Sequence, residues 1–501
     1  MQQIDPMPER VCREPLDAAH WLARHGLPAG VGGFCELSPE AALVRWLMTG
    51  AEALAMDVPA LCLGGARANV LVALAHEHAP LDDILRLRFI PGSVSDFCPG
   101  AAGGLIGVLS YDDMEKVAYC SGARVCEVLG GGENKACPAA NAPSFVRQVL
   151  IAVEAPADRR TAVLRFSPDR RRDALSRLDG FLDAAARLAG QSDFMAGIQR
   201  GAVLRPERSD KDHVDAVRRV IDAVREGRWY QLNLLRFLRL EFTDGEAGQP
   251  VRQDAPPPGW FAWRMDTAGG EWSSLLDGPV GRIVSFSPER FTAVDPDRDG
   301  ASLRTFPVKG TIARNRDPVQ DAANANWLAS SRKDLAELHM IVDLMRNDFH
   351  RVALPGSVKV TTEQMIRSHA NVHHLHAEVT ARIGKSVSLG DLLGAICPAG
   401  SITGTPKMEV IRGIREFEGR RRGYHMGNVF HWRPDGSFDS SVLIRTVASV
   451  PGGTATVPGS HGAYELAAGS GIVVHSEPES ELAEVMAKAR IVSAPLNQLS
   501  G

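Results

Sequence analysis

Two segments of the sequence carry acidic side chains in pairs, at a spacing that suits a divalent cation. Asp334 and Glu337 stand three residues apart in "RKDLAELHMIVDLMRND", and Glu481 and Glu484 repeat this spacing in "PESELAEVMAKARIV". Residues three apart share one face of a helix, where like charges repel unless a cation lies against them. Mg²⁺ prefers oxygen ligands of this kind. The alternative is two solvated helix faces, and each pattern taken alone favours that alternative.

A lysine stands where a short apolar strand meets a turn. Lys309 follows Val308 and precedes Gly310 in "FPVKGT". Taken alone, this pattern indicates a surface lysine beside a turn. If the residue is buried instead, desolvation favours its neutral amine, which is the nucleophilic form. The surrounding sequence has to decide between these two interpretations.

Further segments offer groups that suit an anion or a polar substrate. "CPAGSITGTPK" and "LAAGSGIVVHS" are rich in glycine, and the backbone N–H groups of such segments suit a carboxylate. Arg445, in "VLIRTV", has a guanidinium that can hold a carboxylate through two hydrogen bonds. In "RWYQLNLLRF" a two-residue period puts Gln231 and Asn233 on one face of a strand. That pattern alone indicates a half-exposed edge strand.

The elements that must position these groups belong to a large chain of mixed class. The 501 residues, 44% apolar and 23% charged, have the composition of an ordinary globular protein. Strand-like and helix-like segments alternate, which predicts an α/β or α+β fold. We expect a connector over residues 191–208, and then a helix that begins at Ser209 or Asp210 with Val214 and Val217 on its apolar face.

The bulk properties argue against several classes of partner and location. A formal net charge of −4 gives no general attraction to nucleic acid or to anionic membranes. No apolar run reaches the roughly 18 residues that a spanning helix needs, and the N-terminal segment lacks the apolar core of a signal peptide. The eight cysteines form no C-x-x-C pair, which favours free thiols. We therefore expect a cytoplasmic protein with no nucleic-acid or membrane partner.

Taken together and in this order, eight segments resemble the chorismate-utilising enzymes. This family includes anthranilate synthase component I, aminodeoxychorismate synthase component I, isochorismate synthase and salicylate synthase. The segments cover roughly residues 209–492, and "GGLIGVLSYDDMEK" extends the resemblance, with less force, into the first part of the chain. They are "GRWYQLNLLRF", "SFSPERF", "FPVKGT", "KDLAELHMIVDLMRNDFHRVALPGSVKV", "VHHLHAEV", "CPAGSITGTPK", "SVLIRTV" and "AAGSGIVVHSEPESELAEVMAKA".

The resemblance implies a fold, a substrate and a cofactor. The fold is two large β-sheets in a sandwich with helices outside, an N-terminal subdomain over residues 1–200 and a chorismate-binding catalytic domain over residues 209–492. The substrate is chorismate. The cofactor is Mg²⁺, and its implied ligands are Glu337 and Glu484, with Asp334 and Glu481 close by.

The same resemblance implies roles for individual residues. Glu289, in "SPERF", matches the general acid that protonates the departing C4 hydroxyl of chorismate. Arg445 and the backbone N–H groups of Gly469 and Gly471 would hold a substrate carboxylate. The other implied contacts are His374 with the ring, and Thr311, Ser401 and Gln231 in the wall of the pocket.

Two positions indicate which branch of the family the chain resembles. The water-using enzymes have a lysine base where this chain has Gln231, and an amide cannot deprotonate water. Anthranilate synthases usually read P-I-A-G-T and aminodeoxychorismate synthases P-I-K-G-T, where this chain reads P-V-K-G-T with Lys309. The resemblance implies that this lysine adds at C2 of chorismate before ammonia adds at C4. It is closest to aminodeoxychorismate synthase component I, and anthranilate synthase component I is the alternative.

Several positions depart from the family's pattern. The family often has Glu where Asp334 stands and Ala where Thr405 stands, and it usually has Gly-Tyr where this chain has Phe430 and His431. We expect Phe430 to lie beside the substrate site, where it would narrow the pocket or shift the specificity. A pocket blocked by Phe430 would leave a non-catalytic chorismate-binding protein as a second alternative. The sequence has no G-x-C-x-G segment of a glutamine-hydrolysing domain. Ammonia would therefore come from a glutamine amidotransferase subunit or from solution.

Overall fold

The computed structural model consists of two large sheets that meet at one shared strand. It describes residues 12–29, 37–54, 61–65, 68–91, 93–98, 101–118, 142–155, 161–242, 256, 259–265, 268, 270–279, 281–368, 372–450 and 463–495. Hydrogen bonds join twenty strands into one antiparallel network, which divides at β5 (Phe145–Ala155). The first half of β5 pairs with β4 (Gly104–Leu109) and the second half with β6 (Ala162–Phe166), while β3 (Ala68–Ala79) lies along its other edge.

In the first sheet, the strand that carries Gln231 and Asn233 is the last but one. In spatial order it consists of β1 (Cys12–Leu16), β6, β5, β3, β2 (Leu61–Gly65), β9 (Trp272–Gly278), β10 (Gly281–Ser287), β19 (Thr446–Ser449), β20 (Tyr464–Ile472), β8 (Gln231–Phe242) and β7 (Ala202–Pro206). The short β16 (Gly404–Thr405) pairs with the start of β8.

The second sheet ends in three strands, one of which carries Lys309. In spatial order it consists of β4, β17 (Asn428–Trp432), β18 (Phe438–Val442), β11 (Arg290–Asp297), β12 (Gly300–Thr305) and β15 (Val372–Ile383). Beyond β12, β13 (Val308–Ala313) pairs with the same edge of β15, and β14 (Lys359–Ser368) pairs with its opposite edge.

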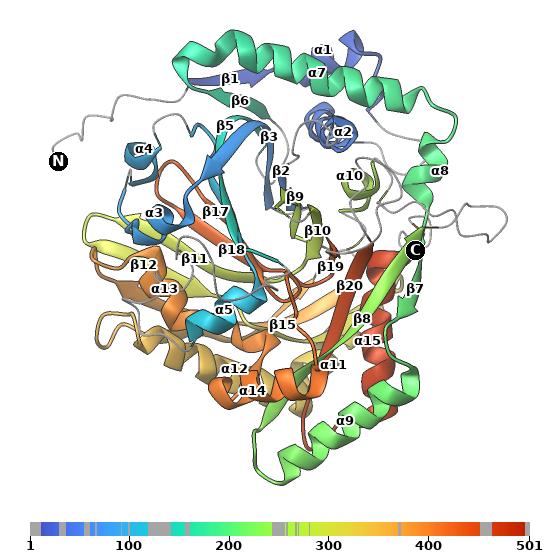
Figure 1. Ribbon diagram of the computed structural model, residues 1–501, viewed down its shortest axis with the longest axis vertical. Coiled ribbons are helices and arrows are strands. Elements are labelled where there is room, and N and C mark those ends of the chain that lie inside the picture. The colour runs from blue at the N-terminus through green and yellow to red at the C-terminus, as the bar shows by residue number, and fades with distance from the viewer. Residues whose placement is uncertain are drawn as a thin grey trace.

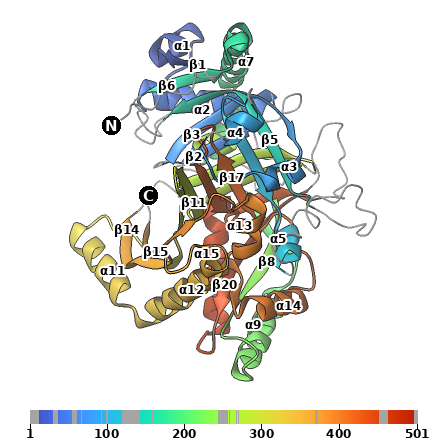
Figure 2. The ribbon, with the colours of Figure 1, turned by 90° about the vertical axis from the view of Figure 1, so that its left-hand side faces the viewer.

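Helices cover the outer faces of the two sheets (Figures 1 and 2). Those of the first part are α1 (Ala18–Arg24), α2 (Pro39–Leu54), α3 (Leu81–Arg86), α4 (Ser93–Phe97), α5 (Tyr111–Ala118), α7 (Arg171–Ala189) and α8 (Phe194–Gln199). Those of the second part are α9 (Asp210–Arg225), α10 (Trp260–Arg264), α11 (Pro318–Ser330), α12 (Arg332–His350), α13 (Leu389–Ile396), α14 (Lys407–Glu418) and α15 (Pro478–Ser493). Among the described residues, no helix combines the length and the apolar character needed to cross a bilayer.

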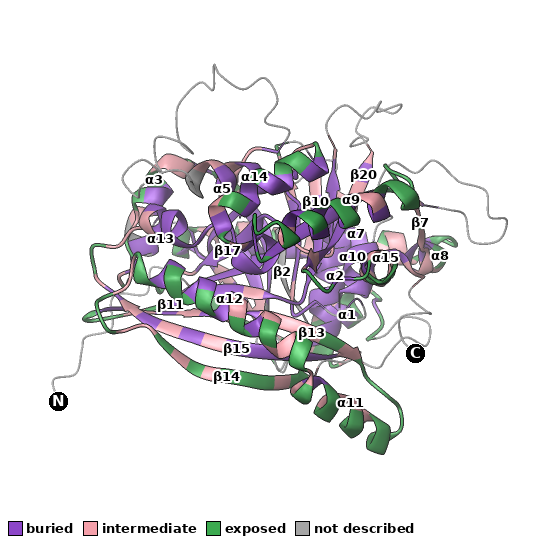
Figure 3. Cartoon of the chain, turned by 90° about the horizontal axis from the view of Figure 1, so that it is seen from below, coloured by how far each residue is buried: buried purple, intermediate pink, exposed green. Residues whose placement is uncertain are grey.

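Two large hydrophobic clusters hold the sheets and helices together. The first lies where α2, α7, α10 and α15 pack on the first sheet, and Trp46 meets Trp263 there with ring centroids 5.4 Å apart. The second lies where α12 and α13 pack on the second sheet, around Leu338, Met345 and Leu375. Burial is dense between the sheets, whereas α11 and β14 stand at the periphery with many exposed residues (Figure 3). Helices α12 and α15, which carry the paired carboxylates, are therefore packed firmly against the sheets.

The structure confirms the predicted fold class and the predicted helix after residue 208. Ser209 caps α9 in a capping box with Asp212, and Val214 and Val217 are buried. The connector expected over residues 191–208 was wrong, since that range contains α8 and β7. β7 is short, and most of its side chains are at least partly exposed. Its residues therefore do not indicate that it pairs with β8.

The observed sheets also bear on the expected edge strand at Gln231 and on the two predicted ranges. β8 is an interior strand and not a half-exposed edge, because β7, β16 and β20 pair with it and almost all its residues are buried. Strands from the predicted ranges 1–200 and 209–492 share both sheets: β2 pairs with β9, and β4 pairs with β17.

A buried ion pair fastens α12 to the start of α14. Nζ of Lys407 lies 2.5 Å from Oδ2 of Asp348 and also donates to the carbonyl of Ile396 at 2.9 Å. The two side chains are 8% and 3% exposed. Burial raises the pKa of Asp348, and the nearby ammonium of Lys407 opposes that rise. Removing either partner alone would leave a buried charge without compensation and would destabilise the fold.

Replacing Lys407 with methionine is expected to lower the free energy of unfolding by about 3–5 kcal/mol, because the carboxylate of Asp348 would remain buried without its partner. The matched control is the double variant Lys407→Met with Asp348→Leu, which removes both charges and should recover most of the loss. Urea unfolding followed by tryptophan fluorescence measures both variants. Equal stability of the single and double variants would contradict the account.

Candidate active site

A cavity of about 560 Å³ opens between α12, α15 and the ends of both sheets. Its wall brings together residues from segments that are far apart in the sequence. Of the predicted site residues, those that line it are Glu289, Lys309, Thr311, Asp334, Glu337, His374, Ser401, Arg445, Gly469, Gly471, Glu481 and Glu484. The structure thus gathers twelve of the thirteen predicted residues around one space.

Lys309 is a wall residue of this cavity, so its interpretation as a surface lysine was wrong. A register shift between Lys309 and Thr311, where β13 pairs with β15, leaves Gly310 at a positive φ of 75°. A Cβ at Gly310 would lie 2.9 Å from Oδ1 of Asp334. The Lys309 side chain is 12% exposed, with Nζ 4.0 Å from Oε2 of Glu337. Burial lowers the pKa of Lys309, which favours the nucleophilic amine, although Glu337 opposes this effect.

Gln231, the thirteenth predicted residue, lies behind the wall and reaches it beside a glycine. A Cβ at Gly471 would lie 2.0 Å from Nε2 of Gln231 and 3.4 Å from Nζ of Lys309. Only a glycine at that position leaves room for the amide. The Gln231 side chain is buried, and its Oε1 has no hydrogen-bond partner among the described residues. The amide therefore lies next to the lysine that the sequence singled out.

Glu289 is a buried carboxyl with a pKa suited to proton transfer near neutral pH. Burial raises the pKa of Glu289 to about 7, while the hydroxyl of Ser401 and the charges of Lys309 and Lys488 oppose that rise. The Ser401 hydroxyl lies 2.6 Å from Oε1 of Glu289 and donates to it. A general acid works best when its pKa lies near the working pH.

The four predicted carboxylates lie on two helices that face the cavity, with lysines between them. Nζ of Lys488 lies 2.7 Å from Oε1 of Glu484, its neighbour one turn earlier on α15. Burial raises the pKa of Glu337, and Lys309 opposes this. Burial acts in the same direction on Glu484, but the pairing with Lys488, together with the charges of Lys333 and Lys309, holds the pKa of that carboxyl below its ordinary value.

The donor chemistry of this carboxylate set fits a hard divalent cation, although the set is not gathered into a finished cage. Carboxylate oxygens from α12 and α15 face one cavity, as Mg²⁺ requires when it keeps waters or substrate oxygens as its other ligands. Within the described residues, no three His, Cys, Asp or Glu side chains form a ready-made metal-binding group. The lysine contacts to Glu337 and Glu484 supply the positive charge in this structure.

Arg445 is held at the cavity by an unusual backbone conformation. Its φ is 50° and that of Met426, another wall residue, is 63°, and these are the only non-glycine residues with positive φ in the described part of the chain. Such conformations cost of order 1–3 kcal/mol each and cluster at functional sites. Burial lowers the pKa of Arg445 to about 10, and Nη1 donates to the carbonyl of Ala268 at 3.3 Å.

The free edge of β20 turns backbone groups of the glycine-rich segment towards the cavity. β19 pairs with β20 only between Tyr464 and Leu466, and the carbonyl of Gly469 accepts a hydrogen bond from Lys488 at 2.9 Å. Backbone groups of residues two apart point the same way in a strand, so the N–H groups of Gly469 and Gly471 point to this side as well. The edge has the donors that a substrate carboxylate needs.

His374 and Thr311 form a pair in the cavity wall. Oγ1 of Thr311 lies 2.9 Å from Nδ1 of His374 on the neighbouring strand. The contact fixes the ring of His374 beside the strand that carries Lys309. His374 therefore presents its ring to the cavity from a defined position.

Sequence reasoning missed several wall residues. They are Asn233, Lys333, Met426 and Lys488. Lys488 had a usable signal, because it stands four residues after Glu484 and one helical turn puts it on the same face of α15. Asn233 was noticed on its strand but was assigned to an exposed edge, and the positive φ of Met426 leaves no mark in the sequence.

The expectation that Phe430 narrows the pocket was wrong. Phe430 is buried in the second hydrophobic cluster, and its ring stacks on Phe438 with centroids 5.4 Å apart. Its ring occupies the space beside Gly107, where a Cβ would lie 2.2 Å from the ring. The neighbouring His431 is also buried and lies 2.8 Å from the carbonyl of Gly103. β17 directs Phe430 into the core of the second sheet, away from the cavity.

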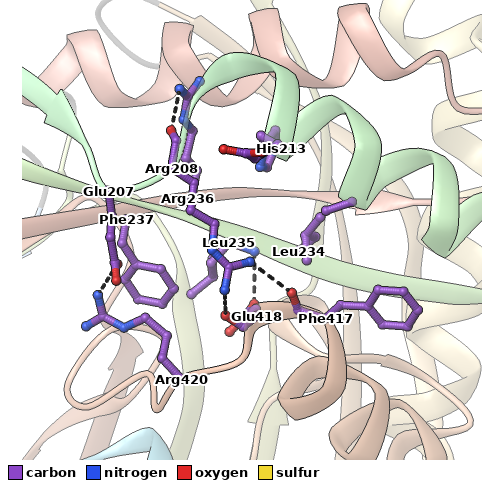
Figure 4. Close-up of a pocket in the computed structure, with 12 residues that line it drawn as sticks. Glu207, Arg208, His213, Leu234, Leu235, Arg236, Phe237, Phe417, Glu418 and Arg420 are labelled. Carbon is purple, nitrogen blue, oxygen red and sulfur yellow. Dashed lines mark hydrogen bonds and ion pairs between the residues drawn. The ribbon is translucent and has the colours of Figure 1, made fainter.

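A second, small cavity lies between α9, β8 and the end of α14 (Figure 4). Arg208 closes it by donating to the carbonyls of Phe417 and Glu418 at 3.3 and 2.7 Å. Its volume of about 20 Å³ has room for little more than one water molecule. A cyclic metabolite does not fit there, so the large cavity is the candidate active site.

Comparison with known proteins shows which family this chain belongs to. A family model described as chorismate binding enzyme matches residues 146–494, which is well over half of the chain. The chain belongs to the chorismate-binding enzyme family. The resemblance that the sequence motifs indicated is therefore confirmed, and the matched range includes every predicted site residue.

Several curated relatives show where in the family the similarity is strong. Aminodeoxychorismate synthase component 1 of Salmonella typhimurium is 37% identical over 287 residues, and that of Escherichia coli is 35% identical over 283 residues. These matches cover 57% and 56% of this chain and the same shares of the two relatives, so the chain spans little more than half of their length. Anthranilate synthase component 1 1 of Halobacterium salinarum is 29% identical and is covered to 77%, against 85% of this chain.

Two solved structures share the fold of this family member. Anthranilate synthase component I from Streptococcus pneumoniae superposes with a TM-score of 0.58 at 22% identity, covering 78% of this chain and 80% of that one. MenF, the menaquinone-specific isochorismate synthase from Escherichia coli, gives 0.61 at 17% identity, covering 98% and 94%. At these identities the similarity establishes the fold, with its two large antiparallel sheets, and leaves the reaction to the residues of the site.

Proposed function

We propose that this chorismate-binding enzyme is an aminodeoxychorismate synthase component 1, which converts chorismate and ammonia into 4-amino-4-deoxychorismate and water. The observation that carries the proposal is the placement of Lys309 beside Gln231. Nζ of the lysine and Nε2 of the amide both lie within 3.4 Å of the position that a Cβ on Gly471 would take. An amide in that place cannot act as the base that water addition needs, whereas a buried amine can act as a nucleophile. The 37% and 35% identical relatives support the same assignment.

In the proposed reaction Lys309 and Glu289 divide the work of removing the C4 hydroxyl. The neutral Nζ of Lys309 bonds to C2 of chorismate while both ring double bonds shift by one position and the C4–O bond breaks. Glu289 gives its proton to the departing oxygen, which leaves as water. Ammonia then bonds to C4, both double bonds shift back, and the C2–Nζ bond breaks and releases Lys309 as a neutral amine. The new ammonium group returns one proton to Glu289, so the enzyme ends in its starting state.

The remaining wall residues would bind and orient chorismate. We assign one substrate carboxylate to Arg445 and the N–H groups of Gly469 and Gly471, because a buried guanidinium and unpaired strand donors converge there. His374, fixed by Thr311, would lie against the ring. Holding one carboxylate and the ring in this way would keep C2 near Lys309 and the C4 oxygen near Glu289.

We also propose Mg²⁺ as the cofactor, held by Glu337 and Glu484 with Asp334 and Glu481 beside them. When bound, the ion would neutralise a substrate carboxylate and help to fix its position. The lysines that now face Glu337 and Glu484 would then be released from those carboxylates, which leaves Lys309 less tied to a counter-charge.

Ammonia would come from a glutamine amidotransferase subunit. The relatives of 37% and 35% identity carry the name component 1, which suggests a second component. The described part of this chain supplies the chorismate cavity and its charged wall. We therefore place the release of ammonia in a partner protein.

A product assay tests the proposed function. Incubation with chorismate, Mg²⁺ and ammonium should consume chorismate without forming fluorescent anthranilate, and later addition of an aminodeoxychorismate lyase should yield p-aminobenzoate. Addition of excess EDTA should stop the consumption, since the proposed site needs the divalent ion. Fluorescent anthranilate in the absence of the lyase would favour anthranilate synthase component I instead. Binding of chorismate with no product at all would favour a non-catalytic protein.

A further inference from the structure

We infer that Ser401 is a positioning residue for Glu289, and that it acts on the reaction by orienting this carboxyl and not by binding the substrate. The inference rests on the proposed function, because it concerns the group that would protonate the departing C4 hydroxyl. The geometry that carries it is a short contact between two buried side chains. Oγ of Ser401 lies 2.6 Å from Oε1 of Glu289, and the two residues are each 7% exposed.

The contact uses up the hydrogen of the serine hydroxyl. A hydroxyl has a single hydrogen to donate, and Ser401 directs its hydrogen to Oε1 of Glu289. A substrate oxygen could therefore receive nothing from Ser401 unless this bond first broke. Oε2 of Glu289 has no hydrogen bond to any described residue, and Glu289 lines the cavity. One oxygen is thus held while the other is left for the proton that has to be transferred.

Ser401 sits on a turn that is fixed from three sides. The turn Gly400–Ile402 packs against α12 so closely that a Cβ at Gly400 would lie 2.6 Å from Cδ2 of Leu344. Nη1 of the buried Arg422 donates to the carbonyl of Ile402 at 2.9 Å. The N–H of Asn233 on β8 donates to the carbonyl of Thr403 at 2.8 Å. A turn held in this way can place a hydroxyl within the tolerance that catalysis requires.

Apart from the bond to Ser401, the hydrogen bonds of Glu289 to described residues anchor only its backbone. Its N–H donates to Oγ of Ser287 at 3.2 Å, and its carbonyl accepts from the N–H of Val442 at the same distance. The charged groups that act on its side chain are Lys309 from β13 and Lys488 from α15. Both groups lie at the ends of flexible side chains, so neither fixes the direction of the carboxyl. Among the described residues, Ser401 is the one side chain that bonds to it.

The test compares Ser401→Ala, which removes the donor, with Ser401→Thr, which keeps a hydroxyl at the same place. For Ser401→Ala we expect kcat to fall by about 10- to 100-fold, the range for a hydrogen bond to a charged group, with KM for chorismate changed by less than about twofold. Ser401→Thr should restore most of kcat. A melting temperature within a few degrees of the parent in both variants shows that folding is unaffected.

A second readout follows Glu289 without turnover. In the free protein with ¹³C-labelled glutamate carboxyl groups, the Glu289 signal is assigned by its absence in Glu289→Gln. Loss of the Ser401 donor should move the Glu289 titration to higher pH, since that hydrogen bond favours the ionised form. The threonine variant should leave it near the parent value.

The possible outcomes separate the inference from the proposed function. A higher KM with an unchanged Glu289 titration would overturn the inference and make Ser401 a substrate contact. A loss of kcat that threonine does not restore would overturn it as well. A parent protein that makes no aminodeoxychorismate contradicts the proposed function, while the shift of the Glu289 titration still decides whether Ser401 governs the carboxyl.

Discussion

Replacing Lys309 with alanine is expected to lower chorismate turnover by about 10³-fold or more, while the dissociation constant of chorismate changes by less than about threefold. The physical reason is that Nζ of Lys309 would form a bond in the reaction but makes little contribution to holding the substrate carboxylates. Arg445 and the glycine N–H groups, which are assigned that task, stay in place. Lyase-coupled product formation measures turnover, and isothermal titration calorimetry measures chorismate binding.

The matched control for this prediction is Lys309→Arg. Arginine keeps a positive charge near Glu337 but is not deprotonated in proteins, so it cannot supply a nucleophilic nitrogen. If the charge alone matters, the arginine variant should keep much of its activity. If the amine matters, both variants should be equally inactive, which is the expected result. Near-full activity of the alanine variant would contradict the covalent role and return anthranilate-type addition to consideration.

Much of the site was predictable because its chemistry is carried by local patterns. The i, i+3 carboxylates of α12 and α15, the P-V-K-G-T segment and the glycine-rich strand each left a recognisable mark in the sequence. Each mark alone favoured an ordinary structural role. What could not be read locally is that distant segments meet, since Lys309 on β13 and Glu484 on α15 reach one cavity only through the fold.

The errors came from positions whose environment is set by tertiary pairing. Gln231 and Asn233 looked like the polar face of an edge strand, but β20 and β16 cover that strand on both sides of its start. Phe430 was placed near the substrate on sequence position alone, whereas the alternation of β17 turns it into the core against Gly107. Neither outcome is encoded within the few residues around the position.

The predicted fold class was easier to obtain than the course of the chain through it. Alternating strand-like and helix-like segments were enough to predict a mixed fold, because the two periodicities differ clearly. They do not show that β5 serves two sheets or that β2 and β4 pair with strands of the second part. The pairings of β2 and β4 with the second part join residues more than a hundred positions apart, so no local pattern could indicate them.

Glu289→Gln is expected to lower turnover by about 10²–10⁴-fold, because an amide cannot give a proton to the departing oxygen. The parent should also lose activity as the pH rises through about 7, since burial raises the pKa of Glu289 to about 7 and only the protonated form can act as an acid. In the variant this decline should be absent. Rate measurements at saturating chorismate, from about pH 5.5 to about pH 8.5, test both points because this range brackets the pKa of the carboxyl.

Glu289→Gln lowers activity, but at neutral and higher pH it should raise the stability of the protein relative to the parent. A carboxyl whose pKa is higher in the folded than in the unfolded protein contributes stability at low pH, and this contribution is lost as the pH rises through the folded value. The pKa of Glu289 rises from an ordinary 4.5 to about 7 on folding. The parent therefore loses stability between about pH 4.5 and 7, where the unfolded chain has released this proton and the folded protein still holds it. Glutamine stays neutral at every pH. The melting temperature of the variant minus that of the parent should therefore be larger at about pH 8 than at about pH 5. An inactive variant whose stability relative to the parent does not depend on pH would mean that Glu289 is ionised throughout, and it could then not serve as the acid.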